Sequence, residues 1–192
     1  GFGRTQGRRS DYSARGEDHH AKIVIDLEDA YKGAARSITL RAAELDAQGQ
    51  VITKNRTLNV KIPKGVKQGQ KIRLSGQGSA GMGDAAAGDL YLEIEFNPHS
   101  IYSVEAHDVY LNLPLTPWEA ALGATVKVPT PDGIVDLKIP ENTRSGQKLR
   151  LRGRGIPAKQ AGDLYVIAQI TLPTAETDTA KALYRKMEKE MP

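Results

Sequence analysis

Hydrophobic and polar residues alternate along several short stretches of this chain. Apolar side chains occupy every second position in the segments Ile38–Leu40, Leu58–Ile62, Ile72–Leu74, Leu90–Phe96, Val126–Val128, Leu137–Ile139, Leu149–Leu151 and Leu164–Ile170. A period of two is typical of strands that bury one face. The pattern therefore predicts a mainly β chain built from antiparallel sheet.

Two short helices are predicted between these strands by residues that begin and end helices. Asp26 and Thr116 are candidate N-caps, with Pro117 at the first helical position after the second cap. Gly33 and Gly123 follow these caps at equal spacing and are candidate C-terminal glycines. A third helix is predicted at the end of the chain, where apolar residues recur at helical spacing: Ala180, Leu183, Tyr184, Met187 and Met191.

Much of the chain is a duplication. Residues 60–78 and 137–155 are identical at ten of nineteen positions with a constant offset of 77, and GDLY follows at 88–91 and 162–165. A self-match of this length indicates a repeated structural unit. The expected fold is two tandem, similar antiparallel β-barrel or sandwich domains, each with one short helix, followed by a C-terminal helix. The expected boundaries are a flexible Gly/Arg-rich linker at 1–20, domains at 21–98 and 99–172, and the helix at 173–192.

One hairpin is expected to distinguish the two units. The first unit has a long arm, Arg41–Asn55, that turns around Asp46–Gly49. The second unit turns tightly at Pro131–Gly133.

Composition narrows the function classes. The chain of 192 residues has a formal net charge of +4 and no cysteine, which excludes disulfides, thiolate nucleophiles and cysteine-ligated zinc. No stretch reaches the roughly 20 apolar residues of a membrane-spanning helix, and no signal peptide is visible, so no membrane partner is expected. The four histidines lie in no metal or nucleophile motif, and the glycine-rich segment 75–84 lacks the lysine and Ser/Thr of a phosphate loop. We expect a binding protein that is not an enzyme and uses no metal or cofactor.

Several separated motifs resemble a known family. They are LEDAYKG at 27–33, IP followed by GQK in both repeats, the closing GDL, PWEAALG at 117–123 and RGED at 15–18. Together they resemble the C-terminal substrate-binding region of zinc-free J-domain co-chaperones (the DnaJ family), and within it the bacterial branch called curved-DNA-binding protein A. The His-Pro-Asp tripeptide of that family's ATPase-stimulating J domain does not occur here. The chain is therefore expected to be a fragment without the J domain.

The resemblance implies a groove in the first unit that binds unfolded client polypeptide. The matching apolar positions are Ile38, Leu40, Leu58, Val60, Ile72 and Leu74. An extended peptide can dock along an open sheet edge through main-chain hydrogen bonds, while pockets take alternate side chains. The alternative is that all six residues form the core of the unit.

Two cationic features suggest further partners. The resemblance implies that a basic residue before the apolar positions binds the acidic tail of a DnaK-type chaperone, and Arg36 stands there. The second repeat carries a basic ridge formed by Lys148, Arg150, Arg152 and Arg154. Such a ridge can neutralise DNA phosphates, and because few aromatic residues flank it, binding is expected to be weakly sequence-specific. The alternative for both features is an ordinary solvated surface.

The terminal stripe of Leu183, Tyr184, Met187 and Met191 needs a surface to cover it. The resemblance implies a homodimer formed through this helix. The alternative is packing against the second unit of the same chain.

The expected function is a co-chaperone fragment that binds unfolded polypeptide and delivers it to a DnaK-type chaperone in the bacterial cytoplasm. The main alternative is nucleoid-associated DNA binding through basic surface residues. A third alternative is a structural spacer that positions an absent J domain and binds neither ligand.

Overall fold

The computed structural model describes residues 14–45, 48 and 50–191. Most of the predicted flexible linker and most of the predicted turn at Asp46–Gly49 lie outside the described residues. The chain divides into two units. The first ends at His99 and also takes in Ile156–Gln160, and the second comprises Ser100–Gly155 and continues from Ala161.

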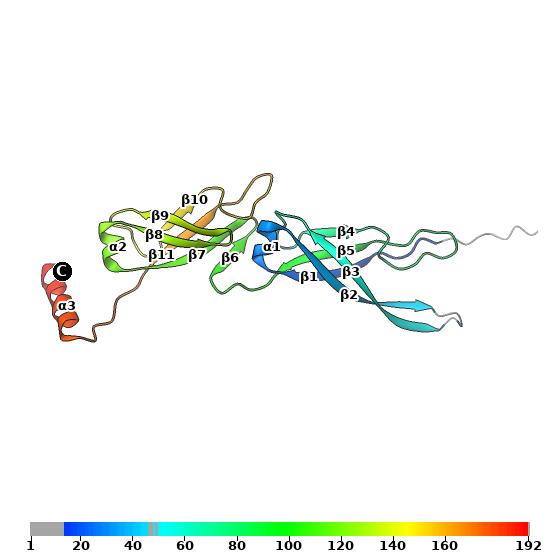
Figure 1. Ribbon diagram of the computed structural model, residues 1–192, viewed down its shortest axis with the longest axis horizontal. Helices are drawn as coiled ribbons and strands as arrows, with labels where there is room; N and C mark the ends of the chain where they lie inside the picture. Colours follow the sequence, from blue (N-terminus) through cyan, green and yellow to red (C-terminus); the bar gives the residue numbers. More distant parts are fainter. Residues whose placement is uncertain (1–13, 46–47, 49, 192) are drawn as a thin grey trace, which may run out of the picture. The chain divides into compact units, whose positions relative to one another are not determined.

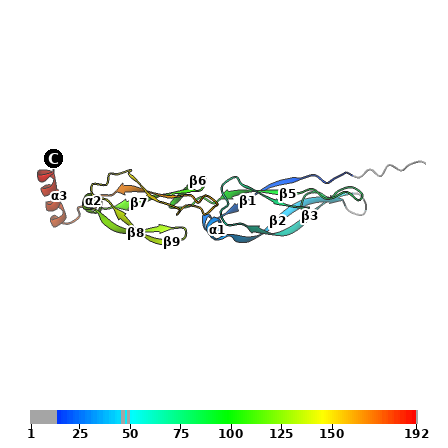
Figure 2. The same ribbon diagram turned by 90° about the horizontal axis from the view of Figure 1, so that it is seen from above.

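The first unit contains a three-stranded sheet, a two-stranded ribbon and one short helix. Its elements are β1 (His19–Ile25), α1 (Leu27–Lys32), β2 (Ala34–Leu45), β3 (Val51–Ile62), β4 (Lys71–Leu74) and β5 (Leu90–Phe96). The sheet has the order β1-β5-β4, whereas β2 and β3 pair only with each other among the described strands. This pair, named the β2–β3 ribbon, lies side by side in both views (Figures 1 and 2).

The second unit repeats this order of elements and adds one strand and one helix. Its elements are β6 (Tyr102–Glu105), β7 (Asp108–Leu115), α2 (Pro117–Leu122), β8 (Ala124–Thr130), β9 (Gly133–Ile139), β10 (Lys148–Leu151), β11 (Leu164–Ile170) and α3 (Asp178–Glu190). The sheet has the order β10-β11-β7-β6, and β8 pairs with β9 as a short hairpin. The alternation pattern did not predict β6 or β7.

One strand pair in each unit is parallel. β1 runs parallel to β5, and β7 runs parallel to β11, while the other pairs are antiparallel. The predicted mainly β fold with two similar modules is confirmed, but the sheets are mixed and remain open among the described strands. A period of two shows that a strand buries one face and does not give the direction of its neighbour. The parallel partners lie far apart in sequence, as a crossover connection requires.

Both short helices begin with reciprocal capping bonds. The Asp26 N–H donates to Asp29 Oδ2 at 3.2 Å, and the Thr116 N–H donates to Glu119 Oε2 at 2.8 Å. Gly33 ends α1 with a φ of 76°, a left-handed conformation that favours glycine. The predicted caps of both helices are confirmed.

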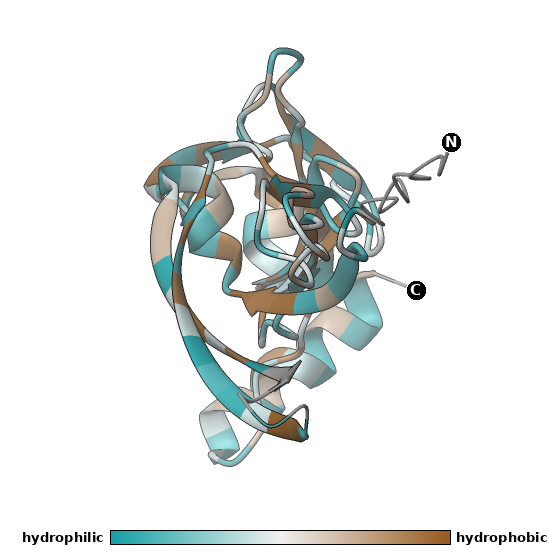
Figure 3. Ribbon diagram, turned by 90° about the vertical axis from the view of Figure 1, so that its right-hand side faces the viewer, coloured by the Kyte–Doolittle hydropathy of each residue, from teal (hydrophilic) through white to brown (hydrophobic). Residues whose placement is uncertain are grey.

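The core of the first unit draws side chains from sheet, ribbon and helix. The largest buried ones are Ile25, Leu27, Val60, Ile62, Val66, Leu90, Leu92 and Ile94. Hydrophobic and hydrophilic residues are interspersed along the strands (Figure 3), and buried residues alternate with more exposed ones along β5 and β11. In the described part of the chain, no helix has the length and hydrophobicity needed to span a bilayer.

Candidate functional site

One face of the β2–β3 ribbon gathers apolar residues, among which the cationic residues Arg36, Lys54 and Arg56 also lie, and it is called the apolar face here. Ile38 lies directly opposite Leu58 in the ladder, and Leu40 follows on the same face. These three side chains are half-buried, whereas Val60, nearer the start of β2, is 1% exposed. Because successive strand residues point to opposite faces, the register gathers four of the six predicted client-binding residues on one face.

The other two predicted residues lie elsewhere. Ile72 and Leu74 belong to β4 at the edge of the three-stranded sheet, where they pair with Leu92 and Leu90. Those two partners are buried, while Ile72 and Leu74 are half-buried. The structure therefore places this pair at the border of the core, in a different sheet from the ribbon.

The equivalent hairpin of the second unit is more buried at two of the three matching positions, while Val135, which matches Leu58, is half-buried. Val128 occupies the position of Ile38 and is 0% exposed, and Thr130 occupies the position of Leu40 and is also buried. β2 and β3 each contain 12 residues, whereas β8 and β9 each contain 7. The longer ribbon of the first unit leaves part of its apolar face uncovered.

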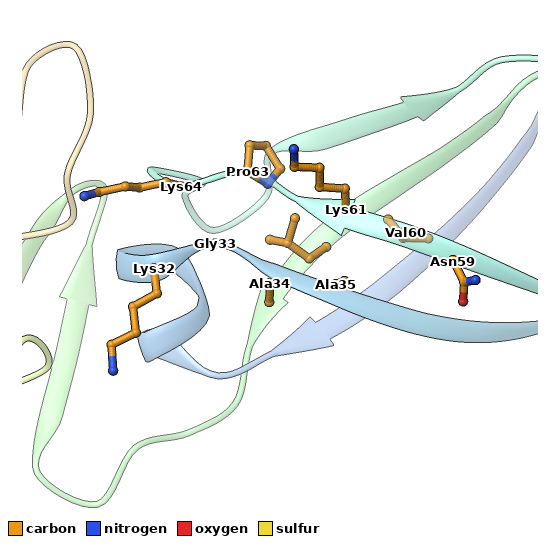
Figure 4. A pocket seen from close by; sticks show the side chains of 10 residues that line it. Lys32, Gly33, Ala34, Ala35, Asn59, Val60, Lys61, Pro63 and Lys64 are labelled. Atoms are coloured by element: carbon orange, nitrogen blue, oxygen red, sulfur yellow. The ribbon is translucent and has the colours of Figure 1, made fainter.

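A cavity of about 550 Å³ lies at the base of the ribbon, where α1 meets β2 (Figure 4). It is lined by Lys32, Gly33, Ala34, Ala35, Asn59, Val60, Lys61, Ile62, Pro63 and Lys64. The three lysine side chains extend from it in different directions (Figure 4). This volume is within the range of small-ligand sites, and Val60 connects it to the apolar face of the ribbon.

Arg36 already has two carboxylate partners in α1 and its cap. Its Nε donates to Asp29 Oδ2 at 3.2 Å, and its guanidinium lies 3.6 Å from Asp26 Oδ2. The hydrogen bond and the negative charge of Asp29 raise the pKa of Arg36. An incoming acidic peptide must therefore compete with these two side chains for the predicted tail-binding cation.

The basic ridge of the second repeat includes a structural ion pair. Arg150 Nε donates to Asp163 Oδ2 at 2.6 Å, and the Gly153 N–H donates to Asp163 Oδ1 at 2.7 Å. The backbone hydrogen bond from Gly153 and then the bond and charge of Arg150 lower the pKa of Asp163, against the opposing effect of burial. Arg152 forms no ion pair with any residue that the structure describes. The ridge therefore contains one arginine that stabilises the fold, Arg150, and other cations that are exposed to solvent.

The first unit repeats this ion pair. Arg73 Nε donates to Asp89 Oδ2 at 2.9 Å, and the Gly76 N–H donates to Asp89 Oδ1 at 2.8 Å. A Cβ on the preceding Gly88 would lie 2.1 Å from the carbonyl oxygen of Glu17, so only glycine fits there. The closing Gly-Asp of each repeat thus holds the fold. The repeated tetrapeptide was visible in the sequence, but its role was not inferred from it.

Two tyrosines flank the ridge, which corrects the expectation of few aromatic neighbours. Tyr110 of β7 and Tyr165 of β11 stack with ring centroids 5.2 Å apart. Lys148 Nζ lies 5.6 Å from the Tyr110 centroid. Strand pairing brings Tyr110 to the ridge from a distant part of the sequence, which a linear pattern does not show.

The apolar stripe of α3 is largely exposed. Leu183, Met187 and Met191 are 61%, 41% and 71% exposed, and no residue of α3 is buried. Tyr184 is half-buried and donates its hydroxyl hydrogen to the Pro173 carbonyl at 2.5 Å. Most of the predicted dimerisation surface is therefore uncovered in the described part of the chain.

These surfaces offer non-covalent chemistry: apolar contacts, main-chain hydrogen bonds at strand edges, and ion pairs. Among the described residues, no cluster of three or more His, Cys, Asp or Glu side chains is arranged to hold a metal ion.

Comparison with known proteins gives consistent matches. Residues 19–173 match the family described as DnaJ C terminal domain. The Curved DNA-binding protein of Coxiella burnetii (strain RSA 493 / Nine Mile phase I) is 51% identical over 185 residues, which cover 96% of this chain and 59% of that protein. The Curved DNA-binding protein of Pseudomonas putida (strain KT2440) is 40% identical over 189 residues, covering 97% and 59%. The chain thus spans about 59% of the length of these relatives.

Proposed function

The chain belongs to the DnaJ C-terminal domain family, and from this premise we propose that it is the client-binding part of a bacterial, cytoplasmic co-chaperone. It binds unfolded polypeptide and passes it to a DnaK-type chaperone without covalent chemistry. The observation that carries this proposal is the half-buried apolar face formed by Ile38, Leu40 and Leu58 on the ribbon. The equivalent position of the second unit, Val128, is sealed, so the first unit is the client-binding one.

The ribbon also offers backbone groups to a client. Since β2 and β3 pair only with each other among the described strands, each has an edge with free main-chain hydrogen-bonding positions. An extended client segment can add along such an edge and place alternate side chains on the apolar face. Each aliphatic side chain buried in this way contributes roughly 1.5–3 kcal/mol. Two or three such contacts, less the cost of ordering and association, give weak binding that permits transfer.

Transfer to the partner chaperone and dimerisation complete the proposal. Arg36 becomes available to an acidic tail when its ion pair with Asp29 opens. The exposed stripe of α3 pairs two copies, so that a dimer presents two client-binding ribbons to one polypeptide.

The test is aggregation of a denatured client protein in the presence of the parent chain or a Leu40→Asp variant. A charge in the middle of the apolar face should remove most of the protection, because an unpaired carboxylate resists burial. The matched control is Ile134→Asp, which changes a 71% exposed residue on the hairpin of the second unit. If Leu40→Asp remains folded by circular dichroism and protects as well as the parent, the client-binding assignment is wrong.

DNA binding is a second proposed function. Both relatives are named curved DNA-binding proteins, and this chain carries a net charge of +4. Binding through phosphates should weaken steeply between about 50 and 200 mM salt because counterions are released. Apolar client binding should change little over this range. If this chain suppresses aggregation but does not bind duplex DNA even at the lower salt concentration, client binding is its only function of the two.

A further inference from the structure

We infer that the cavity at the base of the β2–β3 ribbon binds a small organic anion, that is, an apolar body that carries a phosphate or a carboxylate group. This inference goes beyond client and DNA binding and depends on neither. The cavity of about 550 Å³ is lined by two chain segments, 32–35 and 59–64 (Figure 4). Cavities of this size commonly bind small molecules.

The polar side chains of the cavity are hydrogen-bond donors. Lys32, Lys61 and Lys64 are exposed, and none of them forms an ion pair with any described residue. Asn59 Oδ1 already accepts a hydrogen bond from Ser37 Oγ at 3.0 Å, which leaves its amide nitrogen to donate. Among the described residues, no acidic side chain lines the cavity. Its ligand must therefore be negatively charged and rich in acceptors.

The cavity also has accessible apolar surface. Ala35 and Pro63 are exposed and Ala34 is half-buried, whereas Val60 and Ile62 are each 1% exposed and belong to the core. An inorganic ion would contact only the lysines, but a ligand with an apolar body also removes the surface of these alanines and of Pro63 from water. The lining therefore favours an organic anion over a simple ion.

The three lysines can reach one ligand from several sides. Lys32 ends α1, Lys61 belongs to β3 and Lys64 follows β3, and their side chains leave the cavity in different directions (Figure 4). Each ammonium group ends a flexible stem of four carbons. Because no described carboxylate holds these groups in place, they are free to turn toward an anion that enters between them.

The second unit shows that the shared architecture does not require this charge. The segment 59–64 matches 136–141, and the end of α1 matches the end of α2. At the equivalent positions the second unit carries Leu122 for Lys32, Asp136 for Asn59, Lys138 for Lys61 and Glu141 for Lys64. Two acids and one base thus replace three bases and an amide, so the cationic cavity is a property of the first unit alone.

The anion site is separate from the client-binding residues. Asn59 and Lys61 alternate with Leu58 and Val60 along β3, so their side chains lie on the opposite face of the ribbon. Arg36 lies opposite Val60 in the ladder and therefore belongs to the apolar face. The lysines of the cavity are thus a different set of cations from the one proposed to bind an acidic tail.

The experiment titrates isotope-labelled protein with small probes and follows the backbone amide signals by NMR. Phenyl phosphate and benzoate should cause saturable shifts at the amides of Ala34, Ala35 and Lys61, and their relative affinity shows which anionic group is preferred. Benzyl alcohol keeps the ring and lacks the charge, so it should bind about tenfold more weakly, because exposed ion pairs each contribute up to a few-fold in affinity. Inorganic phosphate, which lacks the ring, should also bind more weakly than phenyl phosphate.

Two variants take their residues from the second unit, where the same architecture carries Leu122 and Glu141. Lys32→Leu should weaken phenyl phosphate binding by about threefold, and the double variant with Lys64→Glu by about tenfold or more. The matched control is Lys138→Glu, the same charge reversal in the second unit, with an expected change below about twofold.

Four outcomes overturn the inference. If neither anion causes a saturable shift, or if the double variant binds phenyl phosphate as tightly as the parent, the lysines do not form a site. If benzyl alcohol binds as tightly as benzoate, or inorganic phosphate as tightly as phenyl phosphate, the ligand is not an organic anion. None of these results changes the proposed client binding, which is measured separately by aggregation.

Discussion

Asp89 and Asp163 are the residues that most clearly link the repeated sequence to the repeated fold. Each accepts a bond from a glycine N–H and from an arginine, and the N–H of each donates to a second aspartate, Asp18 or Asp108. The preceding glycine is equally constrained, since a Cβ at Gly162 would lie 1.8 Å from the His107 carbonyl oxygen. The Gly-Asp pair therefore recurs because a larger residue does not fit at the glycine and because the aspartate carboxylate binds an arginine and a glycine N–H in each unit.

Replacing Asp163 with Asn tests this structural role. The variant keeps the shape of the side chain and removes the charge that binds Arg150, so the unfolding temperature should fall by about 5 °C. The pKa of Asp163 is lower in the folded state than its unfolded value of about 3.9. The contribution of the Asp163 carboxylate to stability is therefore fully present above its unfolded pKa of about 3.9. This contribution is lost as the pH falls from there toward the folded pKa of Asp163.

The measurement is thermal unfolding of parent and variant from neutral pH to acid. The difference between them should be largest near neutral pH and shrink below about pH 4. Asp132→Asn, in the exposed turn before β9, is the control and should leave the unfolding temperature unchanged. A difference that persists undiminished in acid would show that the carboxylate charge is not what stabilises the unit.

At the scale of elements, the local features were predictable and the pairings between distant segments were not. The caps at Asp26 and Thr116 depend on residues three positions apart, so the sequence displays them directly. The parallel pairing of β7 with β11, and the tyrosine stack that it creates, depend on segments far apart in the chain. Periodicity contains no information about such partners.

The ribbon shows the same limit for the candidate site. Alternation placed Ile38, Leu40 and Leu58 on one face, and the register agrees. It could not show that Val60 is buried while the other three remain half-buried, because burial depends on packing against residues that are distant in sequence. It also could not show that Arg36 is held by Asp29, which follows from the return of β2 past α1.

At the scale of the whole molecule, the proposed functions are divided between the two units. The client-binding face belongs to the first unit, and the exposed stripe of α3 belongs to the second. One ribbon binds a client weakly, so useful retention of a long unfolded chain requires more than one contact. Joining two copies makes the second contact intramolecular, and the effective concentration for that contact reaches the millimolar range.

Loss of the dimer should therefore weaken client protection without changing the ribbon. The double variant Leu183→Asp and Met187→Asp puts two charges into the α3 stripe and should convert a dimer to a monomer, measured by light scattering. Its client protection per chain should fall by about tenfold or more, because the second contact is lost. Ala182→Asp places one charge on the opposite side of the same helix and should leave both dimerisation and protection intact. If the double variant is monomeric and protects the client as well as the parent does, avidity has no part in the mechanism. If the parent is itself a monomer at all concentrations, the α3 stripe does not pair two copies.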